Sequence, residues 1–561
     1  MSDVVLLAAP TALATRLLPV LQSVEGPGEV HRITPEALAS GQLQAAKLGR
    51  IVAGIYVPTP AAPPQVGPSA GEAYAALRAL FGSGAEQVVL VSSAEIYGAS
   101  PRNPGFLDET RVNAVRAQRA TISAAWLELE TLAQQLAVEH ASVKLTILRA
   151  CPTLVRGSQD YFSRLLLGRL AVTLAGHDPS LQLLSPDDLG RAIVCALTHA
   201  KAGVWNIAPD SVIPIRAALE LCRAVRVAVP RELQLHPRRW LSALGLAEPL
   251  ERLDYIRYSF TIGTRKAKQE LGFVPTRGSA EALMEFLGDS FVPAGAAAPS
   301  SENARSFDDF GMDKDYLAAR SRGLFEFLAR YYWRIEVEGL EHVPKSGAGI
   351  LAGLHRGLVA WDGVMILHLL SQRMNRYPRF LVHPTGFQFP FVFDFTTKLG
   401  GIVACQENAD YVLEHDELLG IFPEGIRGVF SLYREAYQLR KFGRHDFVKI
   451  ALRHGVPIVP FVIVGSAESY PIVAKFDWAW WTRKTEWPYF PITPTLFPLI
   501  PAPLPAKWHV RFLPPLDVAA EHGPEAARDP AIVRALSDRV KRQMEEAIAD
   551  VTQRRKSIFF G

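Results

Sequence analysis

The sequence is poor in cysteine and lacks any long uninterrupted run of apolar residues. Its four cysteines, Cys151, Cys195, Cys222 and Cys405, lie far apart and form no Cys-x-x-Cys pair. This excludes a disulfide framework and a zinc ribbon, and it fits a reducing cytosol. Because no stretch of about 18 or more apolar residues is present, we expect no conventional membrane-spanning helix.

The chain also lacks a strong charge imbalance and the pattern of a secretory signal. Its net charge is +4 over 561 residues, which gives no reason to expect a nucleic-acid partner. The start, Met1-Ser2-Asp3, has no basic flank, and the apolar segment Val4–Ala9 is too short for a signal peptide. We therefore expect a cytoplasmic protein.

A chain of this length is too long for one hydrophobic core, so we expect two domains. Over residues 1–288, strand-like segments alternate with helix-like segments, a pattern that predicts a parallel sheet flanked by helices. The strand-like segments are Val4–Ala9, Ile51–Val57, Gln87–Ser92 and Lys144–Leu148, and the helix-like segments are Ser69–Phe81, with Ser69 as N-cap, and Ala117–Glu139.

A linker is expected between the two domains. Residues 292–306, VPAGAAAPSSENARS, are rich in Ala, Pro and Ser and have no apolar periodicity. We place the domain limits at 1–288 and 313–561, with 289–312 as the linker. Strands and helices alternate again in the second domain, so an α/β fold is expected for both.

Two short motifs in the second domain carry the chemistry. LHRGLVAWDG at 354–363 contains His355 and Asp362, and IFPEGIRG at 421–428 contains Glu424, Gly425 and Arg427. An imidazole titrates near neutral pH, so His355 suits a general base that a carboxylate orients. A turn with Glu, Gly and Arg suits an oxyanion or a phosphate, because the arginine fork matches phosphate oxygens. Together these groups predict acyl transfer to a hydroxyl.

In this order and spacing, the motifs resemble the lysophospholipid acyltransferases, also called the phospholipid/glycerol acyltransferases, over about 315–561. The resemblance implies a catalytic pair of His355 and Asp362, and an acceptor-binding block. That block consists of Phe422, Pro423, Glu424, Gly425 and Arg427. Val456–Pro460 resembles a later strand block of the family, and the end of the chain, 554–561, resembles the ends of relatives. The donor implied is an acyl thioester, either acyl-CoA or an acyl carrier protein, and no covalent acyl-enzyme is needed.

Two departures from the family leave the acceptor open. Six residues separate His355 from Asp362, where the glycerol-phosphate branch has four, and LGGIVACQENA at 399–409 lacks the arginine that the family often carries there. A lysophospholipid and a neutral acceptor such as a diacylglycerol or a long-chain alcohol are both compatible with these differences.

Other roles for the same residues are weighed beside these. His355 can be structural, Asp362 can cap the helix through Val364–Leu370, and Arg427 can be a surface ion-pair residue. A metal site is not expected, since no third ligand stands at a recognisable spacing. The match to Gly-x-Ser-x-Gly at 67–71 follows a proline-rich stretch rather than a strand, so we interpret it as chance.

The first domain resembles the extended short-chain dehydrogenases, the NAD-dependent epimerase/dehydratase family, in segments such as VLVSSAEIYG at 89–98 and TILRACPTLVRG at 146–157. This implies a Rossmann-like fold. Three residues, Ala8, Thr11 and Ala14, stand where the nucleotide loop has glycines that let the backbone approach a pyrophosphate. Ile122 and Trp126 occupy the positions of the family's catalytic Tyr and Lys. We therefore expect a domain without redox activity, no required cofactor, and weak NAD(P) binding or none, although Tyr97 could replace the missing acid.

A substrate that lives in a bilayer implies contact with a membrane surface. The segment Phe476–Trp508 is rich in aromatic residues and carries Arg483, Lys484 and Lys507, as expected for a headgroup contact or for a buried proline-rich loop. The helix expected at Ala531–Val551, with the basic and aromatic tail after it, is a second candidate.

The sequence as a whole predicts a lipid O-acyltransferase held peripherally at the inner face of a membrane. Two alternatives remain, a protein with two activities whose first domain binds NAD(P), and a non-catalytic lipid- or nucleotide-binding regulatory module.

Overall fold

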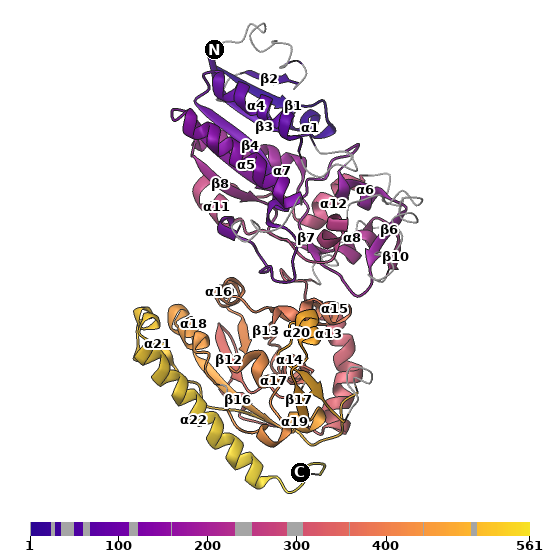
Figure 1. Cartoon of the computed structure of the whole chain (residues 1–561), viewed down its shortest axis with the longest axis vertical. Coiled ribbons are helices and arrows are strands. Elements are labelled where there is room, and N and C mark those ends of the chain that lie inside the picture. Colours follow the sequence, from indigo (N-terminus) through magenta and orange to yellow (C-terminus); the bar gives the residue numbers. More distant parts are fainter. Residues whose placement is uncertain are drawn as a thin grey trace. The chain divides into compact units, whose positions relative to one another are not determined.

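The computed structural model separates the chain into two compact units, Met1–Gly311 and Met312–Gly561 (Figure 1). It describes residues 2–23, 29–34, 37, 50–59, 68–111, 122–158, 160–229, 250–288, 307–357, 359–440, 442–494 and 502–560. Most of the expected linker, residues 289–306, lies outside these ranges. Each unit is described separately below.

The first unit is built on a six-stranded sheet in which every neighbouring pair is parallel. In spatial order its strands are β2 (Glu29–Ile33), β1 (Ser2–Ala8), β3 (Arg50–Val57), β4 (Gln87–Ser93), β5 (Lys144–Ala150) and β8 (Gly203–Ile207). The strand order changes direction between β1 and β3. Ligands of open α/β sheets bind at the carboxyl ends of the strands beside such a change.

Helices cover both faces of this sheet. Alternate residues of β1 belong to two different core clusters, Val4 and Leu6 to one and Val5 and Leu7 to the other. The first cluster includes residues of α1 (Ala12–Gln22) and α7 (Pro186–His199), and the second includes residues of α4 (Ala70–Gly82) and α5 (Ile122–Glu139). The Rossmann-like parallel sheet predicted from the sequence is therefore confirmed, and Ser69 is the N-cap of α4 as expected.

Smaller elements complete the first unit beside the main sheet. They are α6 (Tyr161–Leu167), the pair β6 (Leu170–Leu174) and β10 (Val225–Val229), the pair β7 (Ser180–Leu181) and β9 (Ile213–Pro214), α8 (Ile215–Leu221), α11 (Arg265–Leu271) and α12 (Ser279–Leu287).

The second unit contains a seven-stranded sheet in which only the β16–β19 pair is antiparallel. In spatial order its strands are β11 (Glu336–Glu338), β19 (His509–Phe512), β16 (Ile458–Val464), β12 (Gly349–Gly353), β15 (Leu418–Ile421), β13 (Arg379–Val382) and β14 (Ile402–Val403). The central strands β12 and β16 are completely buried. This is the α/β fold that the sequence predicts for the second domain.

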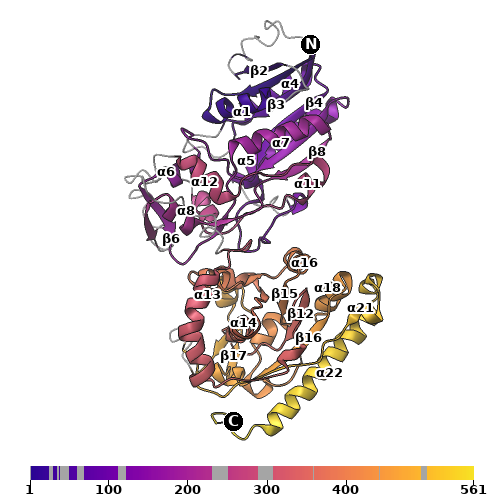
Figure 2. The ribbon, with the colours of Figure 1, turned by 180° about the vertical axis from the view of Figure 1, so that it is seen from behind.

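Helices and one hairpin surround the second sheet (Figure 2). The helices are α13 (Lys314–Arg320), α14 (Trp361–Met374), α15 (Val392–Lys398), α16 (Gln406–Glu414), α17 (Gly425–Val429), α18 (Asp446–His454), α19 (Ser466–Ser469), α20 (Ala479–Thr485), α21 (Val518–Glu521), η11 (Pro524–Arg528) and α22 (Pro530–Arg554). The hairpin joins β17 (Ala474–Phe476) to β18 (Phe490–Ile492).

Two of the aromatic and apolar features expected at a membrane belong to the core instead. Trp508 is 1% exposed and stacks on Trp333 with ring centroids 4.3 Å apart. The apolar residues of α22 are buried, and this helix contacts β16. Across the residues that the structure describes, no helix has both the length and the apolar content needed to cross a bilayer.

Candidate active site

His355 lies just beyond the carboxyl end of β12, where the strand ends at Gly353. Its Nδ1 is 3.0 Å from Oδ2 of Asp362, and its side chain is 12% exposed. One face of the imidazole lies beside the Phe422 ring, with centroids 4.9 Å apart. The structure thus brings together three of the residues that the sequence predicts for the site.

Asp362 is the second residue of α14 and is fully buried. Its Oδ2 accepts a hydrogen bond of 2.9 Å from the backbone N–H of Arg356. The N-cap position of α14 belongs to Ala360, and no side chain caps this helix. The alternative role of Asp362 as a helix cap is therefore wrong. The contact with His355 is close, but its angles fall outside those of a hydrogen bond.

A buried arginine, Arg356, joins the two motifs. Its Nη1 lies 2.5 Å from Oε2 of Glu424, and both side chains are almost fully buried. The same guanidinium donates hydrogen bonds to the carbonyl oxygens of Ala436 at 2.6 Å and Gln438 at 3.1 Å. The sequence prediction assigned no role to Arg356. The one hint in the sequence was that Arg356 directly follows His355. Its partners could not be identified there, because they lie about 70 to 80 residues further along the chain.

The turn after β15 is tightly constrained. Pro423 and Glu424 are buried, and Gly425 has φ of +56°, a conformation that glycine adopts without strain. A methyl group on Gly428 would lie 2.6 Å from Cβ of Glu424 and 3.2 Å from Nη1 of Arg356. Glycine at this position lets α17 approach the Arg356–Glu424 pair.

Two further arginines lie at this turn on the solvent side. Arg427 is exposed on α17. The exposed Arg444 was missed by the sequence prediction, and its Nη1 would lie 3.4 Å from a methyl group built on Gly425. Within the described part of the chain, Arg444 forms no ion pair. The acceptor block therefore lies beside cationic side chains that are accessible from solvent.

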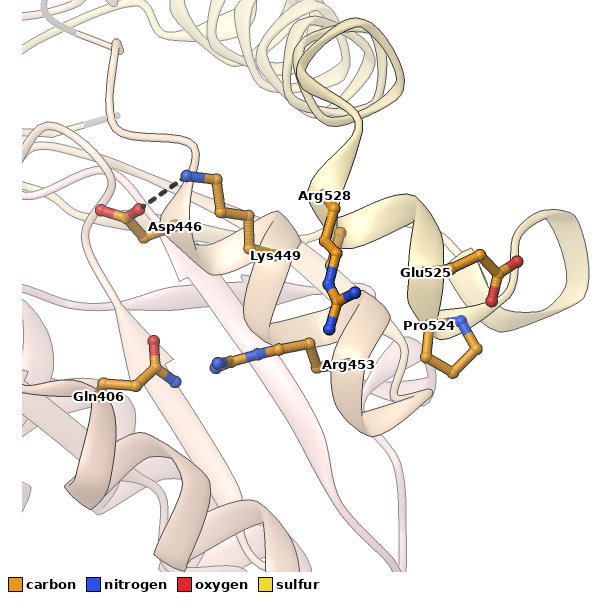
Figure 3. Close-up of a pocket in the computed structure, with 8 residues that line it drawn as sticks. Gln406, Asp446, Lys449, Arg453, Pro524, Glu525 and Arg528 are labelled. Carbon is orange, nitrogen blue, oxygen red and sulfur yellow. Dashed lines mark ion pairs between the residues drawn. The ribbon is translucent and has the colours of Figure 1, made fainter.

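A separate cavity of about 480 Å³ lies between α16, α18 and η11 (Figure 3). Gln406, in the segment 399–409 where the family often carries an arginine, lines it and donates to Asp410 at 2.8 Å. Lys449 pairs with Asp446 at 3.6 Å, and Arg453 pairs with Asp410 at 3.0 Å. Two of the cations at this cavity thus have acidic partners, and His355, Asp362 and Glu424 do not line it. Among the described residues, no group of three metal-ligating side chains is present.

In the first unit, two backbone donors of the loop after β1 are occupied within the loop. The Thr11 N–H donates to the Ala9 carbonyl at 2.6 Å, and the Ala14 N–H donates to Oγ1 of Thr11 at 3.2 Å. Pro10 has no N–H, and the Ala8 and Ala14 side chains are buried. A pyrophosphate is held at a helix N-terminus by free backbone N–H groups. The N–H groups of Thr11 and Ala14 are therefore not free to hold a pyrophosphate in this arrangement.

The region of the missing dehydrogenase acid–base pair is filled by a polar network around Glu95. Its carboxylate accepts hydrogen bonds from Nε1 of Trp126 at 3.1 Å and from Nη1 of Arg252 at 2.5 Å. Nearby, the Tyr97 hydroxyl donates to Oδ1 of Asn206 at 2.6 Å and accepts from Arg149. Burial raises the pKa of the Tyr97 phenol, which makes it a poorer proton donor at neutral pH.

Comparison with known proteins identifies both units. Residues 334–464 match the acyltransferase family, and residues 72–208 match the NAD dependent epimerase/dehydratase family. The uncharacterized protein Rv0502 of Mycobacterium tuberculosis is 35% identical over 262 residues, which are 46% of this chain and 72% of that protein. The chain belongs to the family of this mycobacterial protein. It joins an epimerase/dehydratase-like domain to an acyltransferase domain, and both resemblances seen in the sequence are confirmed.

Other relatives match smaller parts of the chain. The uncharacterized protein Rv0501 of Mycobacterium tuberculosis is 28% identical over 211 residues, 36% of this chain and 54% of that protein. Phytyl ester synthase 2 of Arabidopsis thaliana is 29% identical over 144 residues, 24% of this chain and 20% of that protein. The name of this plant protein agrees with an acyltransferase domain in a general sense.

Among solved structures, the protein MoeE5 in complex with UDP-glucuronic acid and NAD matches with 18% identity and a TM-score of 0.38, and covers 51% of this chain and 99% of its own. The UDP-glucose 4-epimerase of Thermotoga maritima matches with 14% identity and a TM-score of 0.35, and covers 50% of this chain and 96% of its own.

Proposed function

We propose that the acyltransferase domain moves an acyl chain from a thioester to a hydroxyl of a lysophospholipid or another glycerolipid. The observation that carries this proposal is the Nδ1–Oδ2 distance of 3.0 Å between His355 and the buried Asp362. Because Nδ1 lies beside the Asp362 carboxylate, we assign Nε2 as the nitrogen that faces substrate. Asp362 also favours the imidazolium that forms when His355 accepts a proton.

The reaction balances without a covalent acyl-enzyme. Nε2 of His355 takes the proton of the acceptor hydroxyl while its oxygen attacks the thioester carbonyl. The tetrahedral intermediate collapses, the carbon–sulfur bond breaks, and the thiolate receives the proton from the imidazolium. The products are an ester and a free thiol, carried by coenzyme A or by an acyl carrier protein. No metal or other cofactor takes part in these steps.

Residues at the acceptor block have two roles: some stabilise the turn, and others bind the substrate. Because the Glu424 carboxylate is paired with Arg356, we assign it to fixing the turn rather than to direct contact with an acceptor. Arg427 and Arg444, at the solvent side of that turn, are the groups suited to a phosphate on the acceptor. A phosphorylated acceptor is therefore favoured over a neutral one, although the segment 399–409 lacks the arginine that the family often carries there.

For the first domain we propose a structural or regulatory role without redox chemistry. The capped N–H groups at Thr11 and Ala14, and the Glu95 network at Trp126, support this. The membrane location that a lipid acceptor requires would be peripheral, at the cytoplasmic face.

A direct assay tests the proposal. The purified full chain is incubated with radiolabelled acyl-CoA or acyl-acyl carrier protein and a panel of lysophosphatidate, other lysophospholipids, diacylglycerol and long-chain alcohols. We expect labelled ester with at least one phosphorylated acceptor, and loss of it in His355→Ala. Ester formation by a folded His355→Ala variant at the normal rate would exclude this mechanism. Transfer to neutral acceptors alone would exclude the phosphate role of Arg427 and Arg444.

A further inference from the structure

The hairpin between β16 and β19 of the second unit exposes a group of large apolar side chains. We call Phe476, Trp478, Trp480 and Ile492 the aromatic face. Their exposed fractions are 45%, 42%, 54% and 42%. Contiguous apolar patches are rare on soluble monomers and mark places where another surface binds. Trp478 and Trp480 contribute most to this face, since tryptophan has the largest side chain.

These rings pack against one another. Trp478 lies 5.2 Å from Trp480 and 6.2 Å from Phe476 between ring centroids. Phe476 pairs with Phe490 across the β17–β18 ladder, and their rings are 5.1 Å apart. The fold thus presents an ordered apolar face to solvent, at a free-energy cost that a binding partner would remove.

Basic side chains accompany the aromatic face. Arg483 and Lys484 are exposed in the last turn of α20, whereas Nζ of Lys475 is turned inward, 3.1 Å from the Phe430 carbonyl oxygen and 4.6 Å from the centre of the Tyr489 ring. Asp477 and Glu486 are the acidic residues of the same segment, so its net charge is slightly positive. Tryptophan rings favour the headgroup level of a bilayer, and Lys and Arg favour anionic lipids. This combination fits a lipid surface better than it fits a protein partner.

The inner side of the hairpin reaches the acceptor block. Trp481 lies 5.8 Å from Trp487, and Trp487 lies 5.5 Å from Phe430, the residue that follows α17. Ile426 and Val429 of α17 pack on the same small core. The helix that carries Arg427 is therefore joined to the element with the exposed tryptophans through the half-buried rings of Trp481 and Trp487 and the buried ring of Phe430.

We propose that the aromatic face docks the acyltransferase domain onto a bilayer that contains anionic lipid, with Trp478 and Trp480 at headgroup depth. Docking there brings the acceptor block close to the leaflet that holds its substrate. The link to substrate rests on the proposed function, whereas the docking itself does not require that function.

Vesicle binding by the full chain tests the docking. Sucrose-loaded vesicles of phosphatidylcholine, alone or with phosphatidylglycerol, are sedimented with wild type, with Trp478→Ser/Trp480→Ser, and with the control Tyr74→Ser, which removes a 45% exposed ring from the first unit. We expect the double variant to bind at least about tenfold more weakly to both vesicles, and the control to bind as wild type does. Arg483→Gln/Lys484→Gln should weaken binding by about fivefold per charge, only where phosphatidylglycerol is present.

A second readout does not depend on the double variant folding. Vesicles with bromine on the lipid acyl chains should quench the fluorescence of wild type more than that of Trp480→Phe, a change at one exposed ring. Unchanged vesicle binding by a folded double variant, or equal quenching in these two proteins, would overturn the proposal. So would a double variant whose only change is a smaller oligomer in sedimentation velocity, because the face would then bind a second copy of the chain.

The two proposals fail in different ways. If wild type binds vesicles through this face but transfers no acyl chain, the proposed function is wrong and the docking stands. If wild type transfers acyl chains but the double variant binds vesicles normally, the docking is wrong and the function stands. If both are correct, the double variant loses activity on vesicle-bound acceptor and keeps it on a short-chain acceptor dissolved as monomers.

Discussion

His355 and Asp362 form the smallest unit on which the proposed chemistry depends. Because Asp362 is fully buried and bonded to the Arg356 N–H, its carboxylate is fixed before substrate arrives. We expect His355→Ala to lower kcat by about 10² to 10⁴, the usual contribution of a general base. Asp362→Asn should lose part of the rate through misorientation of the ring. Steady-state assays at saturating substrate, with circular dichroism as the folding control, measure this, and a folded His355→Ala variant with normal kcat would remove His355 from the mechanism.

Arg356 stabilises the fold through its buried ion pair with Glu424. Replacement by Met leaves the Glu424 carboxylate buried without its cation, which typically costs about 3 to 5 kcal/mol. For a domain of this size the melting temperature should fall by roughly 10 °C. The melting temperature of Arg356→Lys should lie between those of Arg356→Met and wild type. The lysine keeps a positive charge beside Glu424, but its ammonium cannot reproduce the fork that reaches Ala436 and Gln438. Thermal unfolding followed by circular dichroism checks this order, and three equal melting temperatures would contradict it.

At the scale of elements, strand β12 depends on the absence of a side chain at its end. A methyl group on Gly353 would collide with the ring of Phe461 on the neighbouring strand β16. We expect Gly353→Ala to destabilise the second domain by about 1 to 3 kcal/mol through overpacking, and to lower activity because His355 follows two residues later. Gly323→Ala is the matched control, since a methyl group there meets no atom within 4 Å. Chemical denaturation of both variants measures the difference in stability. Equal midpoints would show that Phe461 and β16 accommodate the methyl group without lowering the free energy of unfolding.

The β1–α1 loop yields a prediction about ligands. Pro10 has no N–H, and the N–H groups of Thr11 and Ala14 are used within the loop. Titration calorimetry of the full chain with NAD⁺, NADH, NADP⁺ and NADPH should therefore show no binding in the micromolar range. A micromolar dissociation constant for any of them would revive the alternative with two activities.

Elements also show what the sequence can and cannot predict. The strands β1, β3, β4 and β5 were predictable because buried parallel strands are short apolar runs, and His355 and Asp362 because their motif is local. The role of Arg356 was not predictable, since its partners Glu424 and Ala436 are brought to it only by the fold. The same holds for Trp508, which belongs to an aromatic segment but stacks in the core on Trp333, whereas Trp480 of that segment is exposed.

For the whole molecule, the division into two units bears on where activity resides. Every group assigned to acyl transfer lies within Met312–Gly561. Met312 is fully buried in the core of the second unit, so a fragment that begins at this residue keeps a contact that one beginning at residue 313 loses.

We therefore expect the fragment Met312–Gly561 to fold alone and to transfer acyl chains to lipid acceptors at a rate within about tenfold of the full chain, since no general base or donor is removed. Circular dichroism and thermal unfolding report the fold, and the vesicle assay with both proteins side by side reports activity. The control is the same fragment with His355→Ala, which should fold and be inactive. A folded fragment without activity, under conditions where the full chain works, would contradict this independence. It would show that the epimerase/dehydratase-like domain contributes residues to the donor or acceptor site, and that fusing the two domains serves catalysis directly.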